Sequence, residues 1–372
     1  MPRSTAPALQ PLHAAYFALC ATLLASACTT PDATLVPAAP ARSVGNPLNT
    51  GAADPFTFAV IGDMPYGPAK RDSMPMLIDL INSDPKVDAV IHLGDIKAGS
   101  KTPCTDAYFA DIRSLFDTFK DPLIYTPGDN EWTDCHQAGK SNGLYTPTER
   151  LAAVRALFFP VPGQTLGGRK MQLLTQADDP ANSAYVENVM FIQSRVVVAT
   201  ANITGSNNDL APWGSPLPAD AASWPSQAAE YATRAQANAA WIDKAFDLAA
   251  STDAAGVVLA FQADMWDPAE PTLSGFDQLV EQIGTLAASF GRPVLLLEGD
   301  SHVWRVDAPF TTGAVVTPTS TLFSALHPVT PVAPNVIRHV VDGSASPTSY
   351  TRLTINSGQK KDLFTLTRVP LQ

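Results

Sequence analysis

Four short apolar runs along the chain each lead into a glycine followed by an aspartate. The clearest run covers residues 87–93, is rich in β-branched residues and precedes Gly94-Asp95. Apolar runs of this length next to turn residues predict buried parallel strands. Runs 56–61, 123–126 and 294–297 precede Asp63, Asp129 and Asp300 in the same way. Because open α/β sheets build their sites at the carboxyl ends of strands, we expect these carboxylates along one edge of one sheet.

Between these runs, apolar residues recur every three or four positions, which predicts helices. The predicted helices cover residues 73–82, 105–119, 148–159, 227–250 and 278–290, and further strands are predicted within 189–200 and over 256–261. Strands that alternate with helices indicate βαβ units and an α/β fold. From about residue 335 two or three more strands follow, for which we expect a second sheet. Residues 202–225 have no period and predict a long loop, either a functional lid or a disordered segment.

Composition and charge narrow the function classes. The chain has 372 residues, of which 45% are hydrophobic and 16% charged, so a sizeable globular core is expected. The formal net charge is -11. An acidic surface repels nucleic acids and anionic membranes, so a bulk nucleic-acid partner is excluded. An anionic substrate would need local positive charge, which bound metal ions can supply.

The N-terminal residues predict export. Arg3 precedes a short Ala/Leu-rich stretch that ends in Ala25-Ser26-Ala27, as in a signal peptide, and residues 1–27 are assigned to it. The stretch is too short to span a bilayer. Residues 28–54 are rich in Pro and Ala and predict a flexible tether, and residues 55–372 form the folded domain. Cys28 resembles the lipidated cysteine of bacterial lipoproteins; the alternative is plain cleavage after Ala27. The expected location is the periplasm or the cell surface, with membrane contact only through a lipid anchor.

Two cysteines in the expected domain lie near the predicted site. Cys104 follows the Asp95 loop, and Cys135 follows the Asp129 loop. Adjacent strands bring these loops together, and an oxidising compartment lets the two thiols pair. We therefore predict a Cys104–Cys135 disulfide.

The polar residues at the strand ends form an ordered series. In chain order they are Gly62-Asp63-Met64-Pro65-Tyr66, Gly94-Asp95, Pro127-Gly128-Asp129-Asn130-Glu131, Gln262 and Gly299-Asp300-Ser301-His302. This series resembles the calcineurin-like metallophosphoesterase superfamily, whose motifs are Asp-x-His or Asp-x-x-Tyr, Gly-Asp, Gly-Asn-His-Asp/Glu, His and Gly-His-x-His. The resemblance covers residues 56 to about 307 and implies a two-sheet αββα sandwich with two metal ions at the strand ends.

The resemblance also implies a ligand set. Asp63, Asp95 and His302 match the ligands of one metal ion, and Asp95 bridges to a second. Tyr66 matches the tyrosinate that binds ferric iron in purple acid phosphatases. The second ion takes Asp95 together with Asp129, Gln262 and Asp300. The implied cofactors are two metal ions, with Fe paired with Mn, Mg or Zn.

Four positions depart from the family pattern. Asp129 stands where the family has Asn, and Asn130 replaces the proton-donating His. Gln262 replaces a ligand His, and Asp300 replaces the first His of the last motif. The second site is therefore richer in oxygen ligands, which favours Mg, Mn, Ca or Fe over Zn.

The implied reaction is hydrolysis of a small phosphorylated substrate. Two cations roughly 3.5 to 4 Å apart can hold a bridging hydroxide for in-line attack on phosphorus. Asn130 can hydrogen-bond a leaving group but cannot protonate it. Glu131, His136 and His92 are the nearest titratable residues in the sequence, and His136 is the favoured proton donor.

Two other functions remain as alternatives. The loss of histidines is also compatible with a non-catalytic surface or binding lipoprotein of the same fold. Ser301 follows Gly299-Asp300, as in some serine esterases, which makes an esterase a minor alternative. Adjacent Ser and His residues do not easily adopt triad geometry, so metal-dependent phosphoesterase is the first hypothesis.

Overall fold

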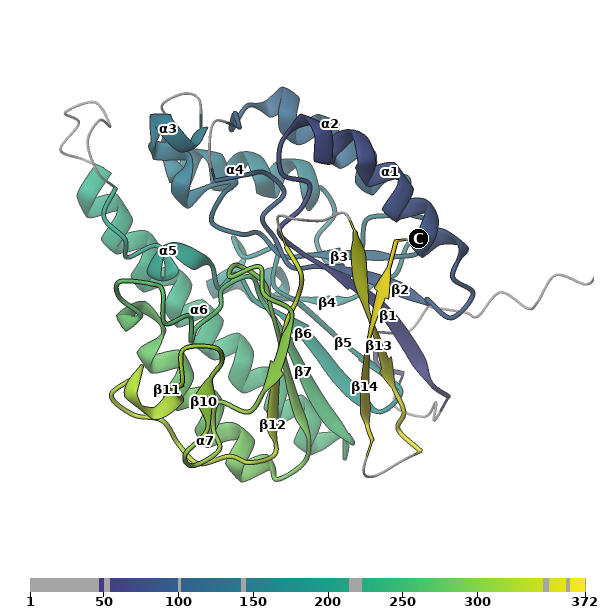
Figure 1. Ribbon diagram of the computed structural model, residues 1–372, viewed down its shortest axis with the longest axis vertical. Coiled ribbons are helices and arrows are strands. Elements are labelled where there is room, and N and C mark those ends of the chain that lie inside the picture. The colour runs from purple at the N-terminus through teal and green to yellow at the C-terminus, as the bar shows by residue number, and fades with distance from the viewer. Residues whose placement is uncertain are drawn as a thin grey trace, which may run out of the picture. The chain divides into compact units, whose positions relative to one another are not determined.

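Two β-sheets form the centre of the fold, and the apolar runs of the sequence supply their strands (Figure 1). This computed structural model describes residues 47–49, 54–99, 102–141, 145–213, 223–343, 348–358 and 362–371. The predicted signal peptide, the lipidated Cys28 and most of the predicted tether lie outside the described residues. Residues Val44–Gln372 make up one compact unit.

The first sheet has five strands in the order β14-β13-β1-β2-β3. Its members are β1 (Phe56–Ile61), β2 (Ala89–His92), β3 (Leu123–Tyr125), β13 (Ser349–Ile355) and β14 (Phe364–Pro370). Strands β1, β2 and β3 are parallel, whereas β13 pairs antiparallel with β1 and β14 antiparallel with β13. The three parallel strands therefore end at the same edge.

The second sheet has seven strands in the order β4-β5-β6-β7-β8-β12-β9. Its members are β4 (Leu174–Thr175), β5 (Val189–Gln193), β6 (Val196–Thr200), β7 (Gly256–Ala260), β8 (Val294–Glu298), β9 (Arg305–Asp307) and β12 (Val336–Val340). Strands β6, β7, β8 and β12 are parallel. Strands β10 (Val315–Val316) and β11 (Thr321–Leu322) pair with each other in a separate two-stranded sheet.

Side chains alternate between the two faces of each strand, and this alternation creates three apolar layers. In β1, Phe58 and Val60 face the layer between the two sheets, where they join Val258 and Leu295 of the second sheet. Ala59 points to the opposite face, toward the helices. Buried residues on both faces of both sheets explain why the strands read as continuous apolar runs.

Helices cover the two outer faces. They are α1 (Pro68–Ser83), α2 (Asp106–Phe116), α3 (Ala138–Ser141), α4 (Pro147–Phe158), α5 (Gly205–Asn208), α6 (Ser223–Ser251) and α7 (Asp277–Phe290). Helices α1, α2 and α4 pack on the first sheet, and α6 and α7 pack on the second (Figure 1). The layers run helix, sheet, sheet, helix, so the predicted αββα sandwich is confirmed. Among the described residues, no helix is long and apolar enough to span a bilayer.

Two expectations about the sheets are wrong. The four Gly-Asp strands do not share one sheet, because β8 belongs to the second sheet while β1, β2 and β3 belong to the first. The C-terminal strands do not form a sheet of their own either: β12 joins the second sheet, and β13 and β14 join the first. Strands buried on both faces have the same apolar pattern in either sheet, so the pattern does not distinguish the partners.

Candidate metal centre

The loops after β1, β2, β3 and β8 bring the predicted ligands together across the two sheets. Asp63, Asp95 and His302 form one cluster, and Asp95, Asp129 and Asp300 form another, with the ligand atoms of each cluster within 4.8 Å of one another. Asp95 belongs to both clusters. We call them the first and the second cluster.

The backbone at these ligands is unusual. Asp63 and Asp95 follow a glycine and have φ angles of 53° and 59°, and Asp300 and His302 have φ angles of 68° and 60°. The left-handed region is uncommon for residues other than glycine and is frequent at functional sites. The Gly-Asp motif therefore bends the chain directly after the strand, and the carboxylate lies at the sheet edge.

The centre has the properties that a metal ion requires. Oδ2 of Asp63 is buried and has no hydrogen-bond partner among the described residues. A Cβ atom at Gly299 would lie 2.6 Å from this oxygen, so glycine is needed there to leave the carboxylate room. Burial, followed by the charges of Asp129 and other carboxylates, raises the pKa of Asp95 well above its usual range. Burial and the same carboxylate neighbour raise the pKa of Asp300.

These observations describe crowded, buried carboxylates that repel one another. Isolated buried charges are unfavourable unless they are paired or bind a metal ion. Carboxylate oxygens with one imidazole suit hard divalent or trivalent cations. The residues present therefore fit two metal ions, one at each cluster.

Tyr66 and Asn130 lie directly on the first cluster. The Tyr66 hydroxyl donates to Asp95 Oδ2 at 2.7 Å and lies 3.2 Å from His302 Nε2. The Asn130 amide nitrogen donates to the Tyr66 oxygen at 3.0 Å and also to Asp95 Oδ2. Burial, followed by the charge of Asp95, raises the pKa of Tyr66 well above its usual range, so the phenol is neutral in this arrangement. Iron ligation by Tyr66 stays a prediction.

Gln262 lies beside the second cluster in a defined orientation. The backbone N–H of Gly205 donates to Gln262 Oε1 at 2.6 Å. Because a backbone N–H can only donate, the atom that faces it is the amide oxygen. The amide nitrogen then faces Asp129, with Nε2 at 3.4 Å from Asp129 Oδ1. In this orientation Gln262 contacts a predicted ligand through its nitrogen, and its own role as a ligand stays a prediction.

Glu131 lies beneath the ligand loops and is fully buried. Its Oε1 accepts hydrogen bonds from Asp95 N at 3.1 Å, Gly128 N at 2.6 Å and the Tyr125 hydroxyl at 2.7 Å. Its Oε2 accepts from Ile96 N at 3.3 Å. The side chain therefore joins the loop after β2 to the loop after β3, and we interpret it as a residue that positions Asp95 rather than as a proton donor.

The disulfide joins the same two loops. Cys104 and Cys135 are bonded with their Cα atoms 6.0 Å apart, as predicted. His136 follows within the buried turn Thr133–His136, where its Nδ1 lies 2.7 Å from the Thr133 carbonyl oxygen and its ring lies 6.5 Å from the ring of Trp213. His92 lies inside β2, and burial lowers its pKa to about 4, so it is a neutral core residue.

Ser301 does not pair with an imidazole in the described structure. Its Oγ accepts a hydrogen bond from Arg305 Nη2 at 2.7 Å. The adjacent His302 faces Asp63, with Nε2 at 3.5 Å from Asp63 Oδ1. Ser301 therefore lacks the contact with a general base that a serine nucleophile needs.

Sequence reasoning missed a second group of residues at the centre. Residues 206–209 all have φ angles between 52° and 66°, which makes a left-handed turn of four residues other than glycine. This conformation costs roughly 1–2 kcal/mol per residue. The turn contains Ser206, whose Oγ lies 2.9 Å from Asp129 Oδ2 and 2.9 Å from Asp134 Oδ1. The sequence Asn207-Asn208-Asp209 is the available signal, because Asn and Asp tolerate this conformation best.

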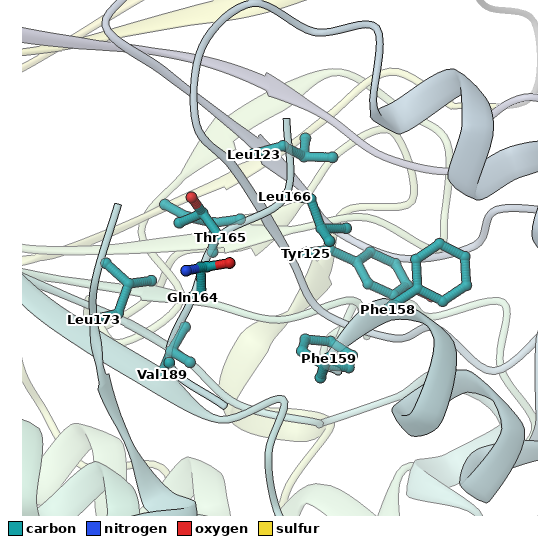
Figure 2. Close-up of a pocket in the computed structure, with 11 residues that line it drawn as sticks. Leu123, Tyr125, Phe158, Phe159, Gln164, Thr165, Leu166, Leu173 and Val189 are labelled. Carbon is teal, nitrogen blue, oxygen red and sulfur yellow. The ribbon is translucent and has the colours of Figure 1, made fainter. Parts of the chain in front are cut away.

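A separate cavity is lined by residues that belong to neither cluster (Figure 2). Leu123, Tyr125, Phe158, Leu166 and Val189 are among its lining residues. None of the predicted ligands lines it. Its apolar lining offers no charge to a phosphate group, so the carboxylate clusters remain the candidate site.

Comparison with known families agrees with the geometry. Residues 56–210 match the calcineurin-like phosphoesterase family. This segment is therefore similar to that family. It contains the first three motifs of the series, whereas Gln262 and residues 299–302 lie beyond the matched segment. The matched segment contributes Asp63, Asp95 and Asp129 to the two clusters.

A solved structure similar to this chain is described as GAP50, the anchor in the inner membrane complex of Plasmodium. It is 9% identical, the match covers 86% of this chain and 89% of that chain, and the TM-score is 0.45. No curated protein matches the chain in sequence.

Proposed function

We propose that the protein is an exported metal-dependent phosphoesterase with a dinuclear centre. The observation that supports this most is the position of Asp95, which belongs to both carboxylate clusters. A carboxylate shared by two clusters can bridge two cations and fix the distance between them. Two bound cations would lower the pKa of a bound water, and their positive charge would stabilise the phosphoryl oxygens.

The side chains divide into two ligand sets. Asp63, Asp95 and His302 hold one metal ion, with Tyr66 beside them. Asp95, Asp129 and Asp300 hold the other. The oxygen-rich second set favours Mg, Mn, Ca or Fe, and Tyr66 favours ferric iron at the first set.

The leaving group meets a different set of side chains. Asn130 is our candidate for a hydrogen bond to a substrate oxygen. Its Nδ2 donates to Tyr66 and Asp95, so one of these two hydrogen bonds is exchanged when the substrate binds. An amide cannot release a proton, so the proton for the leaving group comes from another residue. His136, which follows the disulfide-bonded Cys135, is our candidate for that residue, and its Nδ1 lies 2.7 Å from the Thr133 carbonyl oxygen.

Export agrees with the cysteine chemistry. A disulfide such as Cys104–Cys135 persists in oxidising compartments. We place the mature protein in the periplasm or at the cell surface, anchored by lipid on Cys28, and its substrate is a small phosphorylated molecule.

The test combines metal content with hydrolysis. Protein that begins at Cys28 is prepared as wild type, Asp95→Ala and Asp79→Ala, the last as a control because Asp79 is exposed on α1. We expect two metal ions per chain and metal-dependent hydrolysis of p-nitrophenyl phosphate or bis-p-nitrophenyl phosphate in wild type and Asp79→Ala, and loss of both in Asp95→Ala. A visible charge-transfer band would indicate, in addition, that Tyr66 binds ferric iron.

Two results would reject the proposal. Metal binding without hydrolysis would favour the non-catalytic binding protein. Folded protein without stoichiometric metal, and without hydrolysis after reconstitution with Mn, Fe or Mg, would exclude the dinuclear enzyme.

A further inference from the structure

The left-handed turn after β6 lies against the second cluster. Gly205 begins the turn, and Ser206, Asn207, Asn208 and Asp209 follow with positive φ angles. The turn closes through hydrogen bonds from Asn208 N to the Thr204 oxygen at 3.1 Å and from Ala211 N to the Ser206 oxygen at 3.0 Å. It is labelled α5 in Figure 1, next to α6. None of its residues belongs to either cluster of predicted ligands.

Gly205 leaves room for two predicted ligands. A Cβ atom at this position would lie 2.7 Å from Asp300 Oδ2 and 2.9 Å from Asp129 Oδ2. Such distances are shorter than van der Waals contact, so any side chain here would displace the carboxylates. The Gly205 N–H also fixes the orientation of the Gln262 amide that faces Asp129.

Ser206 contacts two carboxylates with one hydroxyl. Its Oγ lies 2.9 Å from both Asp129 Oδ2 and Asp134 Oδ1. A serine hydroxyl has a single proton to donate, so it cannot satisfy both carboxylates at once. The contact with Oδ2 fixes the direction of the Asp129 carboxylate at the second cluster.

The rest of the turn is held from behind by buried polar contacts. Arg234 of α6 is fully buried, and its Nη2 donates to the Asn208 carbonyl oxygen at 3.0 Å. The Trp213 indole donates to Asp209 Oδ1 at 2.7 Å. Gly275 N donates to Asn207 Oδ1 at 2.8 Å. A strained conformation persists only where its surroundings over-determine it, and such strain is concentrated at functional sites.

We propose that this turn is the positioning element of the second metal site, in which Gly205 provides the space for Asp129 and Asp300 and Ser206 orients Asp129. This inference rests on the proposed function, because it needs a metal ion at the second cluster. It assigns no ligand role to Ser206. Hydrogen-bond partners of metal ligands typically change metal affinity by 10- to 100-fold when they are removed.

The experiment measures Mn²⁺ binding by titration calorimetry and elemental analysis, and thermal unfolding of each metal-free variant. Ser206→Ala and Ser206→Gly both remove the hydroxyl, but only glycine relieves the left-handed conformation. We expect both to weaken the second Mn²⁺ at least tenfold and to leave the first unchanged, with a higher unfolding midpoint for Ser206→Gly than for Ser206→Ala. If Ser206 had only a structural role, the variant with the higher unfolding midpoint would also have the higher Mn²⁺ affinity.

Gly205→Ala is expected to bind one Mn²⁺ per chain, at the first cluster. Its control is Gly139→Ala, where a Cβ atom would meet no atom within 4 Å, and this variant is expected to bind two. Two ions at wild-type affinity in Gly205→Ala, or in either Ser206 variant, would overturn the inference and leave the proposed function standing. Wild-type protein that binds none of the ions Mn, Fe and Mg would overturn both.

Discussion

Individual buried residues determine how the stability of this protein depends on pH, and His339 is the clearest case. It lies in β12, and its Nε2 lies 2.8 Å from the Thr351 hydroxyl of β13, so it connects the two sheets. Its Nδ1 lies 3.0 Å from the Arg305 carbonyl oxygen, which can only accept. The ring therefore donates through Nδ1 and accepts through Nε2, as a neutral imidazole does. Burial lowers the pKa of His339 from 6.5 to about 4.

The lowered pKa predicts acid sensitivity. Between pH 6.5 and 4 the unfolded chain binds the proton and the folded chain does not, so stability is lost as the pH falls through this window. The difference in pKa corresponds to about 3 kcal/mol. We expect wild type to lose about 3 kcal/mol more unfolding free energy than His339→Asn between pH 7 and pH 4, as measured by urea unfolding. Equal losses in the two proteins would contradict this prediction.

At the same scale, the sequence was sufficient for the predicted ligands, which follow strands, and insufficient for the residues that contact them from other loops. Asp63, Asp95 and Asp129 were predicted because a carboxylate after a buried strand lies at a sheet edge. Ser206 and Asp134 were missed, since neither follows a strand and their proximity to Asp129 depends on a turn without apolar periodicity. The orientation of Glu131 was also missed, because a sequence does not indicate which way a buried side chain points.

Among the elements, the disulfide between the loops of β2 and β3 has the most direct effect. The cross-link between Cys104 and Cys135 closes a loop with a sequence separation of 31 residues. In the chain-entropy account, such a loop stabilises the fold by roughly 3 to 4 kcal/mol. We expect the double variant Cys104→Ala, Cys135→Ala to lose about this much unfolding free energy in denaturant titrations.

The same variant should bind metal more weakly. The disulfide joins the segments that follow Asp95 and Asp129, and both residues belong to the second cluster. A reducing agent applied to the double variant serves as the control and should change nothing. Unchanged stability together with unchanged Mn²⁺ affinity would mean that packing and Glu131 alone hold the two loops.

Most helices and strands could be predicted because their apolar spacing is regular. The helix expected at residues 148–159 is α4 (Pro147–Phe158), and the helix expected at 278–290 is α7 (Asp277–Phe290). The structure of residues 202–225, expected as a long loop, was harder to predict. Residues 205–211 are instead ordered by side-chain contacts with Arg234 and Gly275, which lie far away in the sequence. Contacts of this kind are set by the tertiary fold, and local periodicity does not report them.

For the molecule as a whole, the centre depends on how the two sheets meet. Asp63, Asp95 and Asp129 come from the first sheet, and Asp300 and His302 come from the second. Metal ions bound here would therefore link the two halves of the sandwich. A ligand that binds only the folded state stabilises it by about 2.7 kcal/mol when present at 100 times its dissociation constant.

Removal of the Asp95 charge distinguishes the effect of metal binding on stability from the effect of packing. In the absence of metal, Asp95→Asn relieves repulsion among buried carboxylates, so this variant should unfold at a higher temperature than metal-free wild type. With excess Mn²⁺ the order should reverse, because wild type gains roughly 5 °C and Asp95→Asn, which lacks the bridging carboxylate, gains little. Thermal unfolding with Mn²⁺ or with EDTA measures all four midpoints. If Mn²⁺ raises both proteins equally, the stabilising ion binds elsewhere, and Asp95 does not connect the two sheets through metal.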